Sequence, residues 1–142
     1  MARLKVFLDT NILTSYFSGK TEARRLFDRD VTKRVQYIIS PLVLQELLIS
    51  EEFGRPDEIK RLLSKHLTIK PLDEGTVQAS AKKIRQLRNT IVHANDILNY
   101  QVAATTADYF LTQDKNVHSL KEIDSVEVIS LEQFFNLLKE AA

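Results

Sequence analysis

The residues of this sequence whose types and spacing could do chemistry are four acids: Asp9, Glu46, Asp96 and Asp114. Asp9 directly follows a short apolar run, and Asp114 follows another apolar run late in the chain. Carboxylates that are brought together repel one another, and some must take up protons unless a cation lies between them. A set of oxygen donors without cysteine suits Mg²⁺ or Mn²⁺. Such ions activate water and stabilise charge on a phosphoryl group, so the pattern is typical of phosphodiester hydrolysis.

Five apolar runs predict the strands that must position these acids: Leu4–Leu8, Tyr37–Ser40, Leu67–Lys70, Tyr109–Thr112 and Val126–Ile129. Longer segments predict helices at Ile12–Phe17, Glu22–Asp28, Pro41–Ser50, Asp57–Lys65, Gly75–Arg88, Asp96–Ala107 and Leu131–Glu140. The alternating order predicts the α/β class: a three-layer α/β/α sandwich whose mostly parallel sheet has about five strands. Because no repeat or linker interrupts the pattern, residues 1–142 are expected to form a single domain.

Two serines predict where helices begin. Ser40 precedes Pro41, so its side chain can cap a helix that has proline at the first position. Ser130 and Gln133 have the spacing of a capping box. Both signals support the predicted strand-to-helix junctions.

The predicted topology brings the four acids to one edge. Asp9 and Asp114 follow strands, and ligands of open α/β sheets gather at the carboxyl ends of strands. Glu46 lies only about 9 Å of helix rise beyond Ser40. The helix that Asp96 begins is about 18 Å long and runs antiparallel to the strand after it, so Asp96 returns to the same level. Asp108 precedes that strand and is expected at the opposite edge.

Each acid also has a purely structural explanation. Asp9 could cap a helix, Asp96 would suit the positive end of a helix dipole, and Asp114 could lie in a plain turn. Glu46 lies in a helix whose apolar residues cover nearly the whole circumference, so that helix is predicted to be buried. Four such coincidences at one edge favour a shared site over four separate structural roles. His66 and His118 have no evident partner and are expected at the surface.

The motifs resemble those of the PIN-domain family. The matching segments are Val6-Phe7-Leu8-Asp9-Thr10-Asn11, then Glu46 within Pro41–Leu47, Asp96 within His93–Ala103, and the strand-then-Thr-x-Asp pattern of Ala107–Lys115. They occur in the family's order and cover essentially the whole chain. The sequence departs from the family where small apolar residues usually follow the third acid, because Asn99, Tyr100 and Gln101 are bulkier or more polar.

The resemblance implies a PIN-like fold and Mg²⁺- or Mn²⁺-dependent cleavage of RNA. It assigns Asp9, Glu46, Asp96 and Asp114 to the family's metal-binding quartet, Thr112 to its hydroxyl and Asn11 to the amide that steadies the first acid. PIN proteins of this length resemble VapC-type toxins of type II toxin–antitoxin pairs, which are usually homodimers silenced by a small antitoxin. We therefore expect an endoribonuclease with these partners.

Composition is ordinary for a globular protein, with 44% hydrophobic residues, 27% charged residues and a net charge of +1. The absence of cysteine is compatible with a reducing cytosol, and a cytoplasmic location is expected. No apolar run approaches the roughly 18 residues that span a bilayer. One alternative is a PIN-fold RNA-binding or regulatory module with little nuclease activity. A phosphoacceptor domain of the receiver type is less favoured, because Ser130 rather than a lysine follows the last predicted strand.

Overall fold

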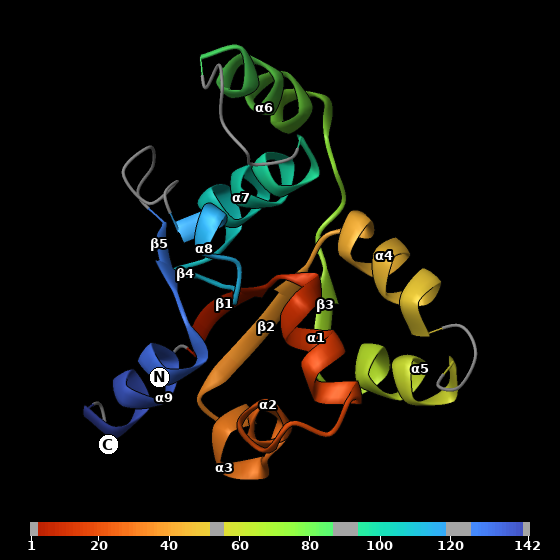
Figure 1. Cartoon of the computed structure of the whole chain (residues 1–142), viewed down its shortest axis with the longest axis vertical. Coiled ribbons are helices and arrows are strands. Elements are labelled where there is room, and N and C mark those ends of the chain that lie inside the picture. Colours follow the sequence, from red (N-terminus) through yellow and green to blue (C-terminus); the bar gives the residue numbers. More distant parts are fainter. Residues whose placement is uncertain (1–2, 52–55, 87–93, 119–125, 141–142) are drawn as a thin grey trace.

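Five parallel strands form the centre of the molecule: β1 (Leu4–Leu8), β2 (Val35–Ile39), β3 (Leu67–Ile69), β4 (Tyr109–Leu111) and β5 (Glu127–Ile129). The computed structural model describes residues 3–51, 56–86, 94–118 and 126–140, and Figure 1 shows their arrangement. The strand order is β3-β2-β1-β4-β5. The α/β class and the parallel sheet are therefore as predicted.

The chain enters this sheet at its central strand. From β1 it moves outward to β2 and β3, then crosses back to add β4 on the other side of β1 and β5 beyond it. Phe7 is level with Ile38 of β2 and with Phe110 of β4. The strand order reverses between β1 and β4, and the carboxyl ends of these two strands are where such sheets bind ligands.

The connecting helices are α1 (Thr10–Phe17), α2 (Thr21–Arg24), η1 (Arg25–Phe27), α3 (Arg29–Thr32), α4 (Pro41–Glu51), α5 (Pro56–Lys65), α6 (Glu74–Gln86), α7 (Ala94–Thr106), α8 (Lys115–His118) and α9 (Leu131–Glu140). The helix predicted at Glu22–Asp28 is present over Thr21–Phe27, but it changes from the α-helix α2 to the 3-10 helix η1 within that range. Asp28, whose backbone is extended (φ −62°, ψ 146°), ends it, and the short helix α3 that follows was not predicted. Helix α8 was not predicted, and residues 87–88 of the predicted sixth helix lie outside the described residues.

Aromatic side chains pack on both faces of the sheet. On one face, Phe110 stacks on Phe7 with ring centroids 5.2 Å apart and contacts Tyr100 of α7 at 6.2 Å. On the other face, Tyr37 contacts Phe27 of η1 and Phe134 of α9. In Figure 1, α6 and α7 accordingly lie on one side of the strands, and α9 with α2 and α3 on the other. The three-layer sandwich follows from these two apolar layers.

Side-chain caps begin two of the helices as predicted. The Val43 N–H donates to Ser40 Oγ at 3.2 Å at the start of α4. Ser130 and Gln133 exchange hydrogen bonds, because the Gln133 N–H donates to Ser130 Oγ and the Ser130 N–H donates to Gln133 Oε1. Both predicted caps are confirmed.

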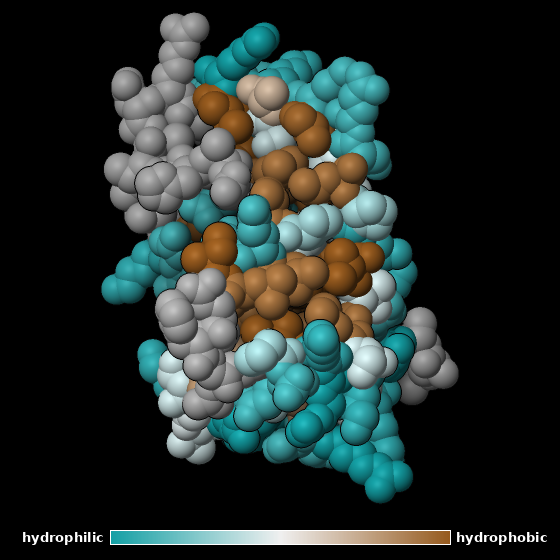
Figure 2. Space-filling view, turned by 90° about the vertical axis from the view of Figure 1, so that its right-hand side faces the viewer, coloured by the Kyte–Doolittle hydropathy of each residue, from teal (hydrophilic) through white to brown (hydrophobic). Residues whose placement is uncertain are grey.

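Helix α4 is not buried all round, so that prediction was wrong. Val43 and Leu47 are fully buried, but Leu48 is 44% exposed and Ile49 is 63% exposed. Figure 2 shows hydrophobic side chains on the side of the molecule where α4 and α6 lie. Apolar residues occur all round α4, but only the face toward α1 and α7 is buried. The outer face is exposed to solvent. No helix in the described part of the chain is both long and apolar enough to cross a bilayer.

Candidate acidic site at the centre of the sheet

Asp9 occupies the first position after β1 and is only 5% exposed. Its backbone N–H donates to the Leu111 carbonyl of β4 at 3.0 Å. One carboxylate oxygen, Oδ1, accepts the Thr10 N–H at 2.8 Å, so Asp9 caps α1. The other, Oδ2, accepts from Thr112 Oγ1, also at 2.8 Å. The structural explanation of Asp9 is therefore correct, and the same carboxylate also joins the ends of two central strands.

Thr112 is fully buried, and its hydroxyl makes every hydrogen bond it can. Besides donating to Asp9, Thr112 Oγ1 accepts from Asn11 Nδ2 and from the Asp114 N–H, each at 3.1 Å. Strand β4 ends at Leu111, one residue before Thr112, so the strand position delivers this hydroxyl to the edge. Because Thr112 Oγ1 already accepts two hydrogen bonds, its own hydrogen points to Asp9 Oδ2. This hydrogen bond fixes the orientation of the Asp9 carboxylate.

Asn11 ties the turn after β1 to the turn after β4. Its amide nitrogen lies 3.4 Å from Asp9 Oδ2, and its Oδ1 accepts the Gln113 N–H at 3.0 Å. The contact of Asn11 with the first acid is thus present. The amide holds Asp9 partly through Thr112 and partly directly.

Glu46 of α4 and Asp96 of α7 act electrostatically on Asp9. The pKa of the Asp9 carboxyl is raised from 3.8 to about 6. Burial is the largest cause, the hydrogen bonds from Thr112 and Thr10 oppose the rise, and the charges of Asp96 and Glu46 add to it. Burial likewise raises the pKa of Glu46, the Thr10 side chain lowers it, and the Asp96 charge raises it. Three of the four predicted acids therefore influence one another across three elements.

Asp114 is linked to this group through its backbone. Its N–H donates to Thr112 Oγ1, and its carbonyl accepts from Val117 and His118 at the start of α8. Asp108, which we expected at the opposite edge, accepts the Lys5 N–H near the beginning of β1 at 3.0 Å. It lies outside the acidic group, as predicted.

Sequence reasoning missed two polar neighbours of the site. Gln113 Oε1 accepts from Ser15 of α1 at 3.1 Å, which adds a second link between α1 and the turn after β4. His118 Nε2 lies 3.2 Å from the Thr112 carbonyl oxygen, so His118 is not the unattached surface residue we expected. The Gln113 contact left no local signal because it joins residues 98 positions apart, and the His118 contact left none because the short helix α8 that carries it was not predicted. His93 lies outside the described residues.

The donor set can be tested against a divalent cation. Within the described ranges, no three Asp, Glu or His side chains are gathered closely enough to hold one ion. Magnesium in proteins, however, usually takes one or two carboxylates and completes its shell with water. The acids that raise the pKa of Asp9 supply only oxygen ligands, and a cation among them would remove their repulsion. The chemistry of the donors fits Mg²⁺ or Mn²⁺.

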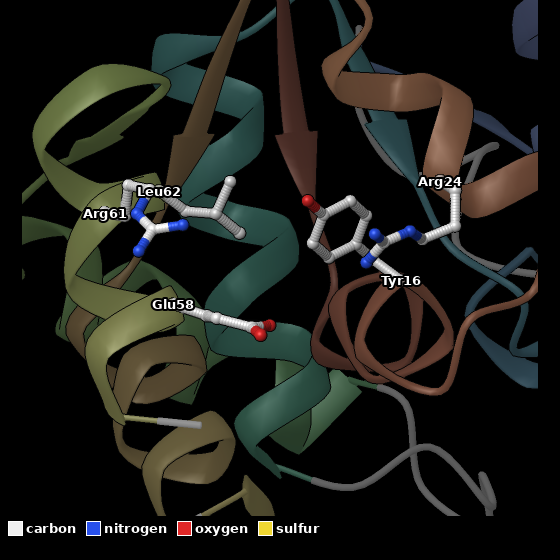
Figure 3. A pocket seen from close by; sticks show the side chains of 5 residues that line it. All are labelled: Tyr16, Arg24, Glu58, Arg61 and Leu62. Atoms are coloured by element: carbon white, nitrogen blue, oxygen red, sulfur yellow. The ribbon is translucent and has the colours of Figure 1, made fainter. Parts of the chain in front are cut away.

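A pocket of about 150 Å³ lies elsewhere, between α1, α2 and α5 (Figure 3). Tyr16, Arg24, Glu58, Arg61 and Leu62 line it. The Arg24 guanidinium stacks on the Tyr16 ring, 4.6 Å from its centroid. None of the predicted site residues lines this pocket.

The fold and the acids define a class: a parallel α/β protein with carboxylates at the point where the strand order reverses. Comparison with known families makes this specific. The sequence profile described as PIN domain matches residues 6–124, and the chain belongs to the PIN-domain family. The resemblance noted from the motifs is confirmed.

Individual relatives are similar over different extents. Ribonuclease VapC2 of Methanocaldococcus jannaschii is 38% identical over 48 residues, which are 34% of this chain and 32% of that protein. The match thus spans about a third of the relative's length. The crystal structure of VapBC2 from Rickettsia felis, bound to promoter DNA, aligns with a TM-score of 0.66 at 17% identity, over 89% of this chain and 98% of that one.

Another similar structure is that of VapC20 from Mycobacterium tuberculosis, described as a toxin that cleaves the sarcin–ricin loop. It aligns with a TM-score of 0.64 at 14% identity, over 80% of this chain and 93% of that one. At these identities the structural likeness concerns the fold. It agrees with the sheet order and the layers described above.

Proposed function

We propose that this protein is a Mg²⁺- or Mn²⁺-dependent endoribonuclease and the toxin of a type II toxin–antitoxin pair. The observation that carries the proposal is the buried Asp9 carboxylate at the reversal point of the sheet, fixed by Thr112 and facing the charges of Glu46 and Asp96. The family assignment and the ribonuclease and toxin relatives support it. We further propose that residues 1–142 form a single domain.

In this proposal the ion would be held by the quartet Asp9, Glu46, Asp96 and Asp114, one or two of these carboxylates binding it directly and the others through water molecules. The chemistry that such an ion supplies is activation of a water molecule and stabilisation of negative charge on the phosphoryl group. Thr112 and Asn11 keep the Asp9 carboxylate in one orientation, so its oxygens need no rearrangement before they bind. A site fixed in advance in this way is the general route to rate enhancement by electrostatics.

The partners belong to the same proposal. RNA is the substrate, a small antitoxin is the inhibitor, and the working form is a homodimer in the cytoplasm. The structures of VapBC2 and of a toxin–antitoxin complex from Klebsiella pneumoniae support an antitoxin partner by analogy. Groove shape and RNA structure, more than the acids, would set the target.

One observation favours a second candidate, a PIN-fold RNA-binding or regulatory module with little nuclease activity. In the part of the chain that the structure describes, no three acids are gathered around one point. Such a module would bind RNA without needing a divalent ion. The two candidates therefore differ in whether cleavage depends on metal.

The test is cleavage of an RNA panel that includes a sarcin–ricin loop, with Mn²⁺, Mg²⁺ or EDTA. We expect metal-dependent cleavage that D9N reduces by about 100-fold or more, because even residues that only support a metal ligand change activity by about 10- to 100-fold. D108N is the matched control, since Asp108 lies at the opposite edge and accepts one backbone hydrogen bond. Cleavage by D9N at the parent rate, or parent cleavage that persists in EDTA, would contradict the proposal.

A further inference from the structure

A buried pair of polar side chains joins the two helices that carry Glu46 and Asp96. Ser40, at the end of β2, donates from its hydroxyl to Asn99 Oδ1 of α7 at 2.5 Å. The same Ser40 oxygen accepts the Val43 N–H and so caps α4. Ser40 is 0% exposed and Asn99 is 1% exposed. The first turn of α4 and the middle of α7 are thus linked through one hydroxyl group.

The pair lies where it can set the position of the acids. Asn99 follows Asp96 by three residues, and residues three apart share one face of a helix. Helices α4 and α7 pack against each other. The Asp96 charge raises the pKa of both Glu46 and Asp9, which requires that the faces carrying these acids be close. The link at Asn99 therefore fixes the same face of α7 that presents Asp96.

Stability alone does not explain an asparagine at this position. Asn99 Nδ2 is buried and has no hydrogen-bond partner among the described residues. A buried polar group without a partner is unfavourable, and this cost offsets what the hydrogen bond from Ser40 contributes to stability. Ser40 could still cap α4 without Asn99, because the cap uses the Ser40 oxygen as an acceptor. What Asn99 adds is the connection between the two helices.

We propose that Asn99 is a positioning residue that, through Ser40, fixes the spacing between α4 and α7 and so holds Asp96 opposite Glu46 and Asp9. The function of this spacing, binding of a divalent ion, rests on the proposed nuclease function. The spacing itself does not. The two parts can therefore be measured separately.

The first measurement is Mn²⁺ binding, followed by electron paramagnetic resonance. We expect N99A and S40G to bind Mn²⁺ about 10-fold more weakly than the parent, as is usual for residues that orient metal ligands. Their RNA cleavage should recover as the Mn²⁺ concentration is raised. Glycine is nearly as favourable as serine at the N-cap position of a helix. S40G therefore removes the hydrogen bond to Asn99 while leaving α4 able to form. S40G thus keeps the test valid if N99A does not fold.

Y37F is the matched control. It also removes a buried hydroxyl, which donates to the Leu26 carbonyl at 2.7 Å, but it does so on the other face of the sheet. Y37F should lose some stability and bind Mn²⁺ like the parent. Equal weakening by Y37F and N99A, or unchanged binding in both N99A and S40G, would overturn the positioning role.

The second measurement is the helix spacing without metal. The chain has no cysteine, so Q45C and T105C place nitroxide labels only at two exposed positions on α4 and α7. We expect N99A or S40G to broaden or shift the distance distribution between the labels, and Y37F to leave it unchanged. An unchanged distribution in both link variants would refute the proposal. Failure of the parent to bind Mn²⁺, with the spacing still dependent on Asn99, would instead refute the nuclease function.

Discussion

At the scale of single residues, Asp9 combines two roles that sequence reasoning had set against each other. It caps α1 through Oδ1 and meets Thr112 through Oδ2, so neither oxygen is idle. The same residue is buried beside two other carboxylates, and burial is the largest cause of its raised pKa. A group in such surroundings destabilises the metal-free fold whenever it is ionised, which makes its pH dependence a direct test.

The metal-free protein should lose stability as the pH rises from about 4 to about 6. In this window folded Asp9 keeps its proton while the unfolded chain releases it, because the folded pKa of about 6 exceeds the ordinary value of 3.8. The shift of roughly two units corresponds to about 3 kcal/mol at neutral pH. Urea denaturation of the parent and D9N in EDTA measures it. Between pH 4 and pH 7, the difference in unfolding free energy between the two proteins should change in favour of D9N by about 2.4 kcal/mol, because part of the effect is already present at pH 4.

That difference isolates Asp9 because most other titrating groups contribute equally to both proteins. D108N should follow the parent across the same range. A constant difference between the parent and D9N at every pH would show that folded Asp9 titrates normally.

At the scale of elements, the ends of β1 and β4 are joined by side chains as well as by the strand ladder. Thr112 accepts from Asn11 and from the Asp114 N–H while donating to Asp9. The turns after both strands therefore depend on one hydroxyl. Replacing Thr112 is therefore expected to break the side-chain connection between the turn after β1 and the turn after β4.

T112V should lower the free energy of unfolding by about 2 kcal/mol or more, because valine fills the space but removes the hydroxyl that donates to the buried Asp9 carboxylate and accepts from Asn11 and the Asp114 N–H. T112S is the matched variant. It keeps the hydroxyl and loses one buried methyl group, which is worth about 1 kcal/mol. Chemical denaturation of the three proteins at pH 7 should rank them parent, T112S, T112V. A T112V protein as stable as T112S would mean that water satisfies the freed donors.

The elements also show how far sequence reasoning reaches. Strand ends and cap residues leave local signals, so the edge that carries Asp9 and Thr112 and the caps at Ser40 and Ser130 could be predicted. The Ser40–Asn99 contact could not, because it joins residues 59 positions apart and depends on how two helices pack. The exposed face of α4 could not be predicted either. When apolar residues occur all round a helix, the sequence does not indicate which of them pack against other elements.

The same limit explains the errors near residue 28 and residue 118. The extended backbone at Asp28 ends η1, and helix α3, which was not predicted, has only four residues. Helix α8 has only four residues, too few for a periodic pattern. His118 owes its place beside Thr112 to that short helix, so its contact was not predictable either.

At the scale of the whole molecule, the acids come from three elements that lie far apart in the sequence. Asp9 follows the central strand, Glu46 lies on α4 and Asp96 lies on α7. A ligand that binds all three would join these elements and would therefore stabilise the fold as a whole. Binding to the folded state alone raises the free energy of unfolding in proportion to the logarithm of ligand concentration.

Mn²⁺ at 100 times its dissociation constant should raise the free energy of unfolding of the parent by about 2.7 kcal/mol. D9N should gain little, because it lacks the central carboxylate, and D108N should gain as much as the parent. Thermal unfolding at a series of Mn²⁺ concentrations measures the effect. An equal gain in all three proteins would place the ion somewhere other than the acidic edge.

The central position of β1 also has a consequence for synthesis. Asp9 and Thr112 are 103 residues apart, and β1 can pair with β4 only after that whole stretch has been translated. Contacts between residues so distant in sequence form late and slowly. In a growing chain on the ribosome, one edge of β1 therefore stays unpaired until β4 has been made. Until then Asp9 also lacks the Thr112 hydroxyl that orients it. Translation itself postpones the completion of the acidic edge.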